Sequence, residues 1–420
     1  MRSGAFYACR RALPEVRHPL EELFMQDHRK LGRELGLFHS DPLVGAGLPL
    51  WLPAGAAARR AVEDYVHGLE RRHGYQHVYS PPLAKVEMYE RSGHLPHFGD
   101  DMFPPMAVSE HDVFVMRPSL CPHHAAVFNA RGRSYRELPL RIGEIGGMYR
   151  AERSGVLGGL SRVRAISLND GHVFCAPEQV LDEVVAALRL MRVAHAALGF
   201  VPSSYRLSLR GDGDKYVDDP PMWSRATAVL RDALAAAGVS YVEVPGEAAF
   251  YGPKIDVQLV DHAGREGTLA TVQVDHFQPA RFDLSYVDAS GERRRPVMVH
   301  RSAVGSMERL FAHLIEVHDG AFPAWYAPVQ VAVLPVGDVS SRSFADRCRA
   351  LDLRIEESYG GSLGARIRAA RKVPFVAVIG AQEAADGTVS LRYRGSGAVR
   401  VLPVAEALSV LAAECRPPLD

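Results

Sequence analysis

The sequence predicts an α+β protein with two folded parts: a larger part that mixes helices and strands, and a small α/β domain after it. Its 420 residues exceed the usual size of one compact domain. Composition and rhythm change after Phe322-Pro323, where apolar strands begin to alternate with helices. We therefore expect three segments: an N-terminal extension over 1–20, the larger part over 21–325 and the α/β domain over 326–420.

Helices in the larger part are predicted from apolar residues that recur every three or four positions. In one of them Pro177 opens the pattern, and Val180, Val184, Leu188 and Met191 form its apolar face. The predicted helices cover residues 20–37, 54–73, 177–198, 222–237 and 306–318. Runs of β-forming residues predict strands at 75–79, 113–116, 138–150, 163–175, 241–244, 255–260, 269–274 and 297–300.

The tail shows a simpler rhythm, which supports a separate α/β unit. Strands are expected at 329–336 and 375–379, and helices at 344–351, 363–371 and 405–415. Asp386-Gly387 is a dipeptide typical of tight turns, so a hairpin is expected there.

Charge and cysteine content exclude several classes of protein. Forty-nine basic residues balance 49 acidic ones, which excludes a polycationic nucleic-acid coat but not a local basic patch. Five scattered cysteines do not form a disulfide framework, so a cytoplasmic protein is expected. No apolar run approaches the ~18 residues that span a bilayer. The arginines within 1–14 suggest a short disordered extension, with a transit peptide as the alternative.

Three segments each contain one residue that binds soft metals. They are Cys121, His172 and His300, which lie far apart in the sequence. Zinc takes thiolate and imidazole ligands, and a catalytic site keeps one position open. The alternative is a buried structural cysteine and two hydrogen-bonded histidines, and the spacing does not decide between them.

Three further segments carry residues suited to phosphate. Arg150 and Glu152 end a predicted strand, where a guanidinium clamps phosphate and a carboxylate accepts from an amine, although a surface ion pair is the simpler reading. Arg309 follows a tight turn at Gly305, and Lys254 follows the turn of 250–253. The glycine-rich phosphate loops of common nucleotide folds do not occur in the sequence.

Taken together and in order, these segments resemble the class II aminoacyl-tRNA synthetases, most specifically the threonyl-tRNA synthetase family. The resemblance covers about residues 21–420 and is carried by several short motifs. They are Asp27-His28-Arg29-Lys30, Met102-Phe103, Leu138-Pro139-Leu140-Arg141, the segment 250–254, Thr271-Val272-Gln273, the segment 300–309 and the junction Ala327-Pro328-Val329-Gln330-Val331.

The resemblance implies a fold and a set of roles. The fold is an antiparallel sheet flanked by helices, followed by an anticodon-binding-like α/β domain, and a motif containing Pro81 forms a homodimer. The implied zinc ligands are Cys121, His172 and His300, and the implied catalytic residues are Arg150, His94, Lys254 and Arg309. ATP is expected to contact Arg150, Glu152, Arg162, Gln273 and Arg309, and the amino acid Asp170, Tyr251 and Ser306. Mg²⁺ is expected to accompany ATP.

The resemblance also implies a reaction: threonine or a related β-hydroxy amino acid is activated with ATP and transferred to tRNA. Valine is nearly isosteric with threonine, and a metal that binds both amine and hydroxyl separates the two. The sequence departs from the family at Ile166, Leu168 and Leu269, which leaves the exact amino acid open. Only residues 1–20 precede the core, so the family's N-terminal editing domain is not expected.

Two other functions remain compatible with the sequence. One is a stand-alone paralogue that makes the adenylate for a carrier protein or a biosynthetic pathway. The other is a binding or regulatory module that keeps the fold without catalysis, although the ligands and arginines argue against it. Basic residues of the tail, such as Arg366, Arg368 and Lys372, are candidates for tRNA contact, with a solvated helix face as the alternative.

Overall fold

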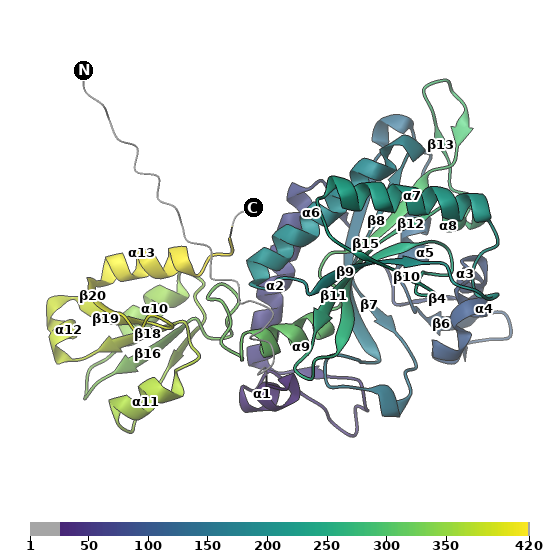
Figure 1. Cartoon of the computed structure of the whole chain (residues 1–420). Helices are drawn as coiled ribbons and strands as arrows, with labels where there is room; N and C mark the ends of the chain where they lie inside the picture. Colours follow the sequence, from purple (N-terminus) through teal and green to yellow (C-terminus); the bar gives the residue numbers. More distant parts are fainter. Residues whose placement is uncertain (1–25, 419–420) are drawn as a thin grey trace, which may run out of the picture.

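The computed structural model describes residues 26–418, and its elements form a large body and a smaller one (Figure 1). The predicted extension over 1–20 lies outside the described residues. One apolar core reaches as far as Ala327, and a second begins at Val331. The predicted boundary at 325/326 falls just before this change of core and stays a prediction.

The large body is built on an eight-stranded sheet with the strand order β10-β9-β11-β12-β15-β8-β7-β3. Neighbours from β9 to β7 pair antiparallel, whereas β10 and β3 pair parallel at the two edges. The strands are β3 (Gln76–His77), β7 (Leu140–Tyr149), β8 (Ala165–Cys175), β9 (Ser204–Leu209), β10 (Val242–Pro245), β11 (Lys254–Val260), β12 (Glu266–Asp275) and β15 (Val297–Ser302). The expected antiparallel sheet of an α+β fold is thus confirmed.

One face of the sheet is covered by four helices: α2 (Pro53–Arg72), α6 (Val180–Leu198), α7 (Pro220–Ala236) and α9 (Met307–Val317). The predicted apolar face of α6 is buried, since Val184, Leu188 and Met191 are at most 1% exposed. The helix begins at Val180 because 177–179 form a 3₁₀ turn, and it ends at the left-handed Gly199. Burying one such side chain stabilises the fold by about 1.5–3 kcal/mol.

The opposite face of the sheet carries the cavity described below. Alternate residues of a strand point to opposite faces, so Val173 and Val299 pack under the helices while Phe174 and Met298 pack on the other side. That side holds α5 (Cys121–Asn129) and α8 (Phe277–Arg281). A small sheet of β4 (Leu83–Lys85), β6 (Val113–Met116) and β5 (Met106–Ala107) lies nearby with α3 (Val86–Arg91) and α4 (His94–Phe98).

The remaining elements of the large body are short. They are α1 (His28–Glu34), β1 (Phe38–His39), β2 (Leu50–Trp51), β13 (Tyr286–Val287) and β14 (Arg293–Arg294). Within residues 26–418, no helix combines the length and apolar character that crossing a bilayer requires. The four cysteines in this range are free and buried.

The smaller body has a five-stranded sheet with the order β17-β16-β18-β19-β20. Its elements are β16 (Val331–Pro335), α10 (Arg342–Arg349), β17 (Ile355–Glu357), α11 (Leu363–Ala369), β18 (Phe375–Ile379), α12 (Ala381–Asp386), β19 (Thr388–Tyr393), β20 (Val399–Pro403) and α13 (Val404–Glu414). The first three strands pair parallel, as expected for an α/β domain. The expected hairpin at Asp386-Gly387 is replaced by α12, which Gly387 ends at φ +64°.

Candidate active site

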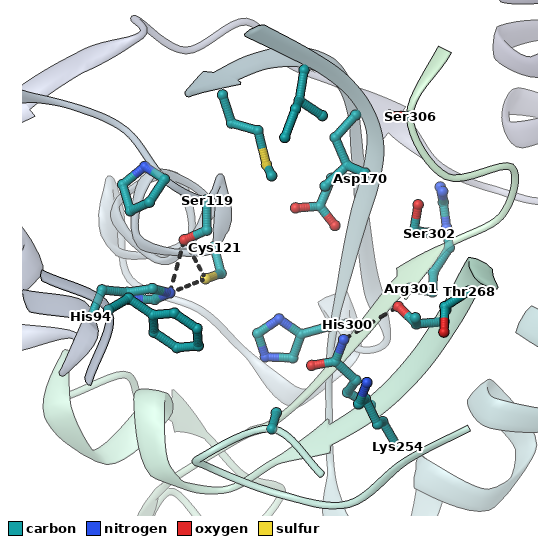
Figure 2. A pocket seen from close by; sticks show the side chains of 18 of the residues that line it. His94, Ser119, Cys121, Asp170, Lys254, Thr268, His300, Arg301, Ser302 and Ser306 are labelled. Atoms are coloured by element: carbon teal, nitrogen blue, oxygen red, sulfur yellow. Dashed lines mark hydrogen bonds between the residues drawn. The ribbon is translucent and has the colours of Figure 1, made fainter. Parts of the chain in front are cut away.

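A cavity of about 440 Å³ opens on the face of the sheet opposite the four helices. Figure 2 shows side chains from several strands and loops converging on it. Most of the residues singled out from the sequence line it: His94, Cys121, Arg150, Asp170, His172, Tyr251, Lys254, Gln273, His300, Ser306 and Arg309. Glu152 and Arg162 line an adjoining cavity instead, and both cavities share Phe98 and Asp101.

His172 and His300 meet because of strand register. They lie directly opposite each other on the neighbouring strands β8 and β15. His172 Nε2 and His300 Nδ1 are 2.9 Å apart. Cys121 is the first residue of α5. Its sulfur and a ring nitrogen of each histidine all lie within 4.8 Å of one another. The three predicted metal ligands are far apart in the sequence, and the fold thus brings them together at one place.

The outer partners of the two histidines determine where their protons lie. His300 Nε2 is 2.9 Å from Asp275 Oδ2, and a carboxylate only accepts, so this nitrogen carries the hydrogen. His124 Nε2 likewise donates to Glu144 Oε2 over 3.3 Å, which leaves His124 Nδ1 to accept from His172 Nδ1 over 2.7 Å. In this arrangement of neutral rings, the two nitrogens that face each other both present lone pairs.

Two lone pairs that face each other repel unless a positive charge lies between them. A thiolate at Cys121 would increase this repulsion. Burial opposes a thiolate, but the neighbouring rings of His94, His172 and His300 hold the pKa of Cys121 well below its usual range. Burial likewise opposes a charged imidazole, yet Asp275 and Cys121 raise the pKa of His300. Protons or a metal ion supply this charge. One thiolate and two imidazoles fit Zn²⁺, because they match its preferred donors and leave a fourth position open.

Asp170 stands beside this cluster on the same strand face as His172. Its Oδ2 lies 3.9 Å from His172 Nε2. Burial raises the pKa of Asp170 to about 6, against the opposing influence of His124 and His300. A carboxyl group in this environment is suited to accept a hydrogen bond from a polar ligand in the cavity. The apolar Ile166 and Leu168 line the cavity from the same strand.

The other end of the cavity is positively charged. Desolvation and the neighbouring charge of Arg150 lower the pKa of Arg309. Arg309 Nη1 donates to Thr268 O over 2.6 Å, and Nε donates to Ser161 O over 3.2 Å. Two guanidinium groups that repel each other gain free energy when an anion binds between them.

Local structure fixes the position of these cations. Ser306 caps α9 by accepting from Arg309 N over 3.1 Å. Gly305 precedes it at φ +69°, and a Cβ there would approach Leu269 O to 2.2 Å, so the turn requires glycine. Lys254 Nζ pairs with Asp256 Oδ2 at 2.9 Å. In the adjoining cavity, Arg162 Nη2 pairs with Glu152 Oε2 at 2.8 Å.

His94 occupies the wall opposite the sheet. Its Nδ1 lies 2.8 Å from Ser92 Oγ and its Nε2 lies 2.9 Å from Ser119 Oγ. Ser119 Oγ is also 3.3 Å from Cys121 Sγ, and Figure 2 shows the three side chains as a triangle. The ring of His94 packs edge-on against Phe250, whose loop also supplies Tyr251. The Tyr251 hydroxyl donates to Gln273 Oε1 over 2.5 Å.

Several residues of this site were not singled out from the sequence. Four of them, Ser119, His124, Asp275 and Gln278, contact the predicted ligands or His94, and the fifth, Glu144, contacts His124. His124 lies one helical turn after Cys121, a spacing that places two residues on one helix face. That spacing is the one signal in the sequence that points to any of them.

A second cluster with metal-binding residue types lies outside the cavity, where His28 and His262 both contact Glu316. His28 Nε2 accepts from Leu160 N–H over 3.1 Å, so its Nδ1 carries the proton that it donates to Glu316 over 2.7 Å. Both nitrogens of His28 are thereby occupied. This cluster is a hydrogen-bond junction between α1, α9 and the loop containing Leu160.

Comparisons with known proteins find relatives over both bodies of the chain. Residues 106–318 match the tRNA synthetase class II core domain (G, H, P, S and T), and residues 330–414 match the anticodon binding domain family. Threonine–tRNA ligase of Levilactobacillus brevis is 47% identical over 384 residues, covering 89% of this chain and 59% of that protein. Threonine–tRNA ligase 1 of Bacillus subtilis is 44% identical over 413 residues, covering 96% and 64%.

Solved structures give the same result. A structure described as the RNA binding domain of threonyl-tRNA synthetase from Cryptosporidium parvum has a TM-score of 0.88 and 32% identity, covering 94% of this chain and 100% of that one. A putative threonyl-tRNA synthetase from Aeropyrum pernix has a TM-score of 0.76 and 26% identity, covering 94% and 98%. The chain spans about 59–64% of the length of the two curated relatives named above. With its core and its C-terminal domain both matched, the chain belongs to the class II aminoacyl-tRNA synthetase family, with threonine–tRNA ligases as relatives.

Proposed function

We propose that the chain activates threonine, or a closely related β-hydroxy amino acid, with ATP and transfers it to tRNA. One observation carries the proposal: Cys121, His172 and His300 converge beside Asp170 at one end of a cavity whose other end holds Arg150 and Arg309. The first end suits an amine and a hydroxyl, and the second suits phosphate. The curated relatives are threonine–tRNA ligases, which favours threonine over other amino acids.

The first half-reaction joins the amino-acid carboxylate to the α-phosphate of ATP and releases pyrophosphate. Negative charge accumulates on the phosphate oxygens as the bond forms, and Arg150 and Arg309 are placed to neutralise it. Lys254 is held by Asp256 at the same cavity and is available to the phosphates. Adenine is proposed to bind beside Glu152 and Arg162. Mg²⁺ is proposed to bind the phosphates of ATP.

Zn²⁺ bound by Cys121, His172 and His300 would supply a Lewis acid that takes the amine and the side-chain hydroxyl of the substrate. Asp170 provides the second contact for that hydroxyl. Valine lacks the hydroxyl, so it would leave Asp170 without a partner in a buried position. Rejection by an unsatisfied polar group is stronger than rejection by shape alone.

The second half-reaction requires a hydroxyl of the tRNA 3′-terminal ribose to attack the carbonyl of the adenylate, with AMP leaving. His94 is proposed to accept the proton of that hydroxyl. Its Nδ1–H is held by Ser92, and its Nε2 faces Ser119 at the cavity wall. The anticodon-binding family match over 330–414 supports tRNA as the acceptor rather than a carrier protein. A homodimer in the cytoplasm is proposed on the same resemblance.

An ATP–pyrophosphate exchange screen over the twenty amino acids tests the proposal, followed by charging of tRNA with the best substrate. We expect exchange with threonine well above exchange with valine, and charged tRNA as the product. Exchange without charged tRNA would favour a carrier protein as acceptor. Absence of exchange with every amino acid, by folded protein loaded with Zn²⁺, would contradict an adenylating activity.

A further inference from the structure

We propose that the side-chain amide of Gln278 is a positioning group that donates a hydrogen bond to the sulfur of Cys121 and thereby lowers the electron donation of this ligand to the metal. The inference rests on the metal site of the proposed function and deepens it. Gln278 Nε2 lies 3.3 Å from Cys121 Sγ, and Gln278 is 0% exposed. A metal-bound thiolate accepts hydrogen bonds and donates none, so the amide must present its N–H to the sulfur.

Ser119 Oγ and His94 Nε2 also lie near the sulfur, at 3.3 and 3.7 Å, but neither has a proton left for it. Ser92 Oγ donates to Tyr89 O over 3.3 Å, and so it accepts from His94 Nδ1–H. His94 Nε2 is then a bare acceptor, and Ser119 donates to it over 2.9 Å. Within residues 26–418, Gln278 is therefore the donor that the hydrogen-bond pattern leaves for Cys121.

Burying the polar side chain of Gln278 destabilises the fold, because one of its polar atoms is left without a hydrogen bond from residues 26–418. Its Oε1 is buried and has no hydrogen-bond partner among the described residues. A methionine would fill nearly the same space without a stranded carbonyl oxygen. The amide is therefore explained by what its nitrogen does, and the one atom that its nitrogen contacts is the sulfur.

Gln278 is also held by a residue that already serves the site. Asp275 Oδ1 accepts from the backbone N–H groups of Phe277 and Gln278 over 2.7 and 2.9 Å, which fixes the start of α8. The other oxygen of Asp275 accepts from His300. The segment 275–278 thus orients two of the three ligands, whereas His124 orients the third.

The physical consequence is a more electrophilic metal. An N–H···S hydrogen bond stabilises the sulfur lone pairs, so the thiolate donates less charge, and outer partners of this kind tune both metal affinity and reactivity. A less neutralised cation binds the amine and hydroxyl of the amino acid more tightly. Removing the hydrogen bond should weaken amino-acid binding without affecting ATP binding.

Cobalt substitution tests this inference directly. Co²⁺ in the zinc site gives a thiolate-to-metal charge-transfer band, whose energy falls when the sulfur lone pairs lose stabilisation. In the full chain loaded with Co²⁺, Gln278→Met should shift this band to longer wavelength. Ser119→Ala should leave it in place, since the Ser119 proton belongs to His94. Gln330→Met is the matched control, because Gln330 is 2% exposed and lies beyond the core of the large body.

Kinetics and metal affinity supply a second readout. In the zinc enzyme, Gln278→Met should raise the KM for threonine by about tenfold with the KM for ATP unchanged, and metal affinity should change by no more than about 10–100-fold. Should the methionine variant not fold, Gln278→Asn is read in the same way, because its amide is one methylene too short to reach the sulfur. An unshifted cobalt band in a folded, loaded variant overturns the inference.

The outcomes also separate this inference from the proposed function. A wild-type cobalt protein with a thiolate band, together with an unshifted variant, overturns the role of Gln278 alone. A wild-type cobalt protein without any thiolate band shows that Cys121 is not a ligand, which overturns the metal assignment and the role of Gln278 with it.

Discussion

The two bodies of the chain differ in their histidine content and in the polar side chains that they bury. All 18 histidines lie at or before His318, in the sequence of the large body and its N-terminal segment, whereas the sequence from 331 onward contains none. Among the described residues from 326 onward, Gln330 and Ser341 are the buried polar side chains, while the large body buries many, including Arg117, Glu144 and Arg301. The smaller body is stabilised by apolar packing, and the larger one accepts buried polar groups where its site requires them.

The largest expected effect concerns the metal site. Cys121→Ser should abolish zinc retention and pyrophosphate exchange together, because the alcohol of serine is a poor zinc ligand. Metal analysis of the purified variant and exchange assays measure both. Normal exchange by protein shown to contain no zinc would contradict the metal assignment. The fold of the smaller body should be unaffected.

Arg150→Ala should lower pyrophosphate exchange by about 10²–10³-fold, since one group that stabilises transition-state charge is worth this much. Circular dichroism should show an unchanged fold, because Arg150 lies at the end of a strand and not within a core. Arg189→Ala, exposed on α6 across the sheet from the cavity, is a matched control that removes the same charge. Equal exchange by wild type and the Arg150 variant would refute the role of this residue.

In the smaller body, Leu391→Ala should destabilise the domain by about 2–5 kcal/mol, because it leaves a cavity in a core from which solvent is excluded. Exchange with threonine should stay near normal, while charging of tRNA should fall. Denaturant unfolding, measured together with the exchange and charging assays, tests whether the two bodies function separately. A loss of exchange equal to the loss of charging would contradict this separation.

Acid should unfold the large body first. Burial lowers the pKa of His195 and of His313 from 6.5 to about 4, so both rings are neutral in the folded state. The unfolded chain binds more protons below pH 6.5, so stability is complete above that pH and is lost as the pH falls toward 4. Each histidine should remove about 1–2 kcal/mol at pH 5.5.

Tryptophan fluorescence follows this transition, because Trp51, Trp223 and Trp325 all belong to or pack on the core of the large body. His313→Phe should reduce the pH dependence between 6.5 and 5. A midpoint that does not move with pH in this range would contradict the prediction. The histidine-free smaller body should unfold without this dependence.

The sequence predicted local features well and contacts between distant segments poorly. The apolar face of α6 follows from the spacing of Val180, Val184 and Leu188, because a helix is specified by its own residues. The meeting of His172 and His300 depends on the register of β8 and β15, which spacing does not reveal, and a family resemblance was needed to expect it.

Outer partners and turn chemistry account for what the sequence left out. Gln278 and Glu144 act on the site only through the fold, and neither stands in a pattern that marks it. Asp386-Gly387 does place a left-handed glycine correctly, but that conformation serves a helix end as well as a hairpin. A dipeptide therefore specifies the backbone angle and not the element that uses it.

The pairing of β8 with β15 places a strict limit on change in this chain. Adding or deleting one residue in the middle of either strand would move the residues after it to the opposite face of the sheet. An imidazole would then point into the apolar core beneath α6. Length variation in these two strands should therefore abolish activity, whereas the exposed turn at 289–292 between β13 and β14 can lengthen. Directed evolution of a new substrate preference is thus best confined to point substitutions here and to insertions there.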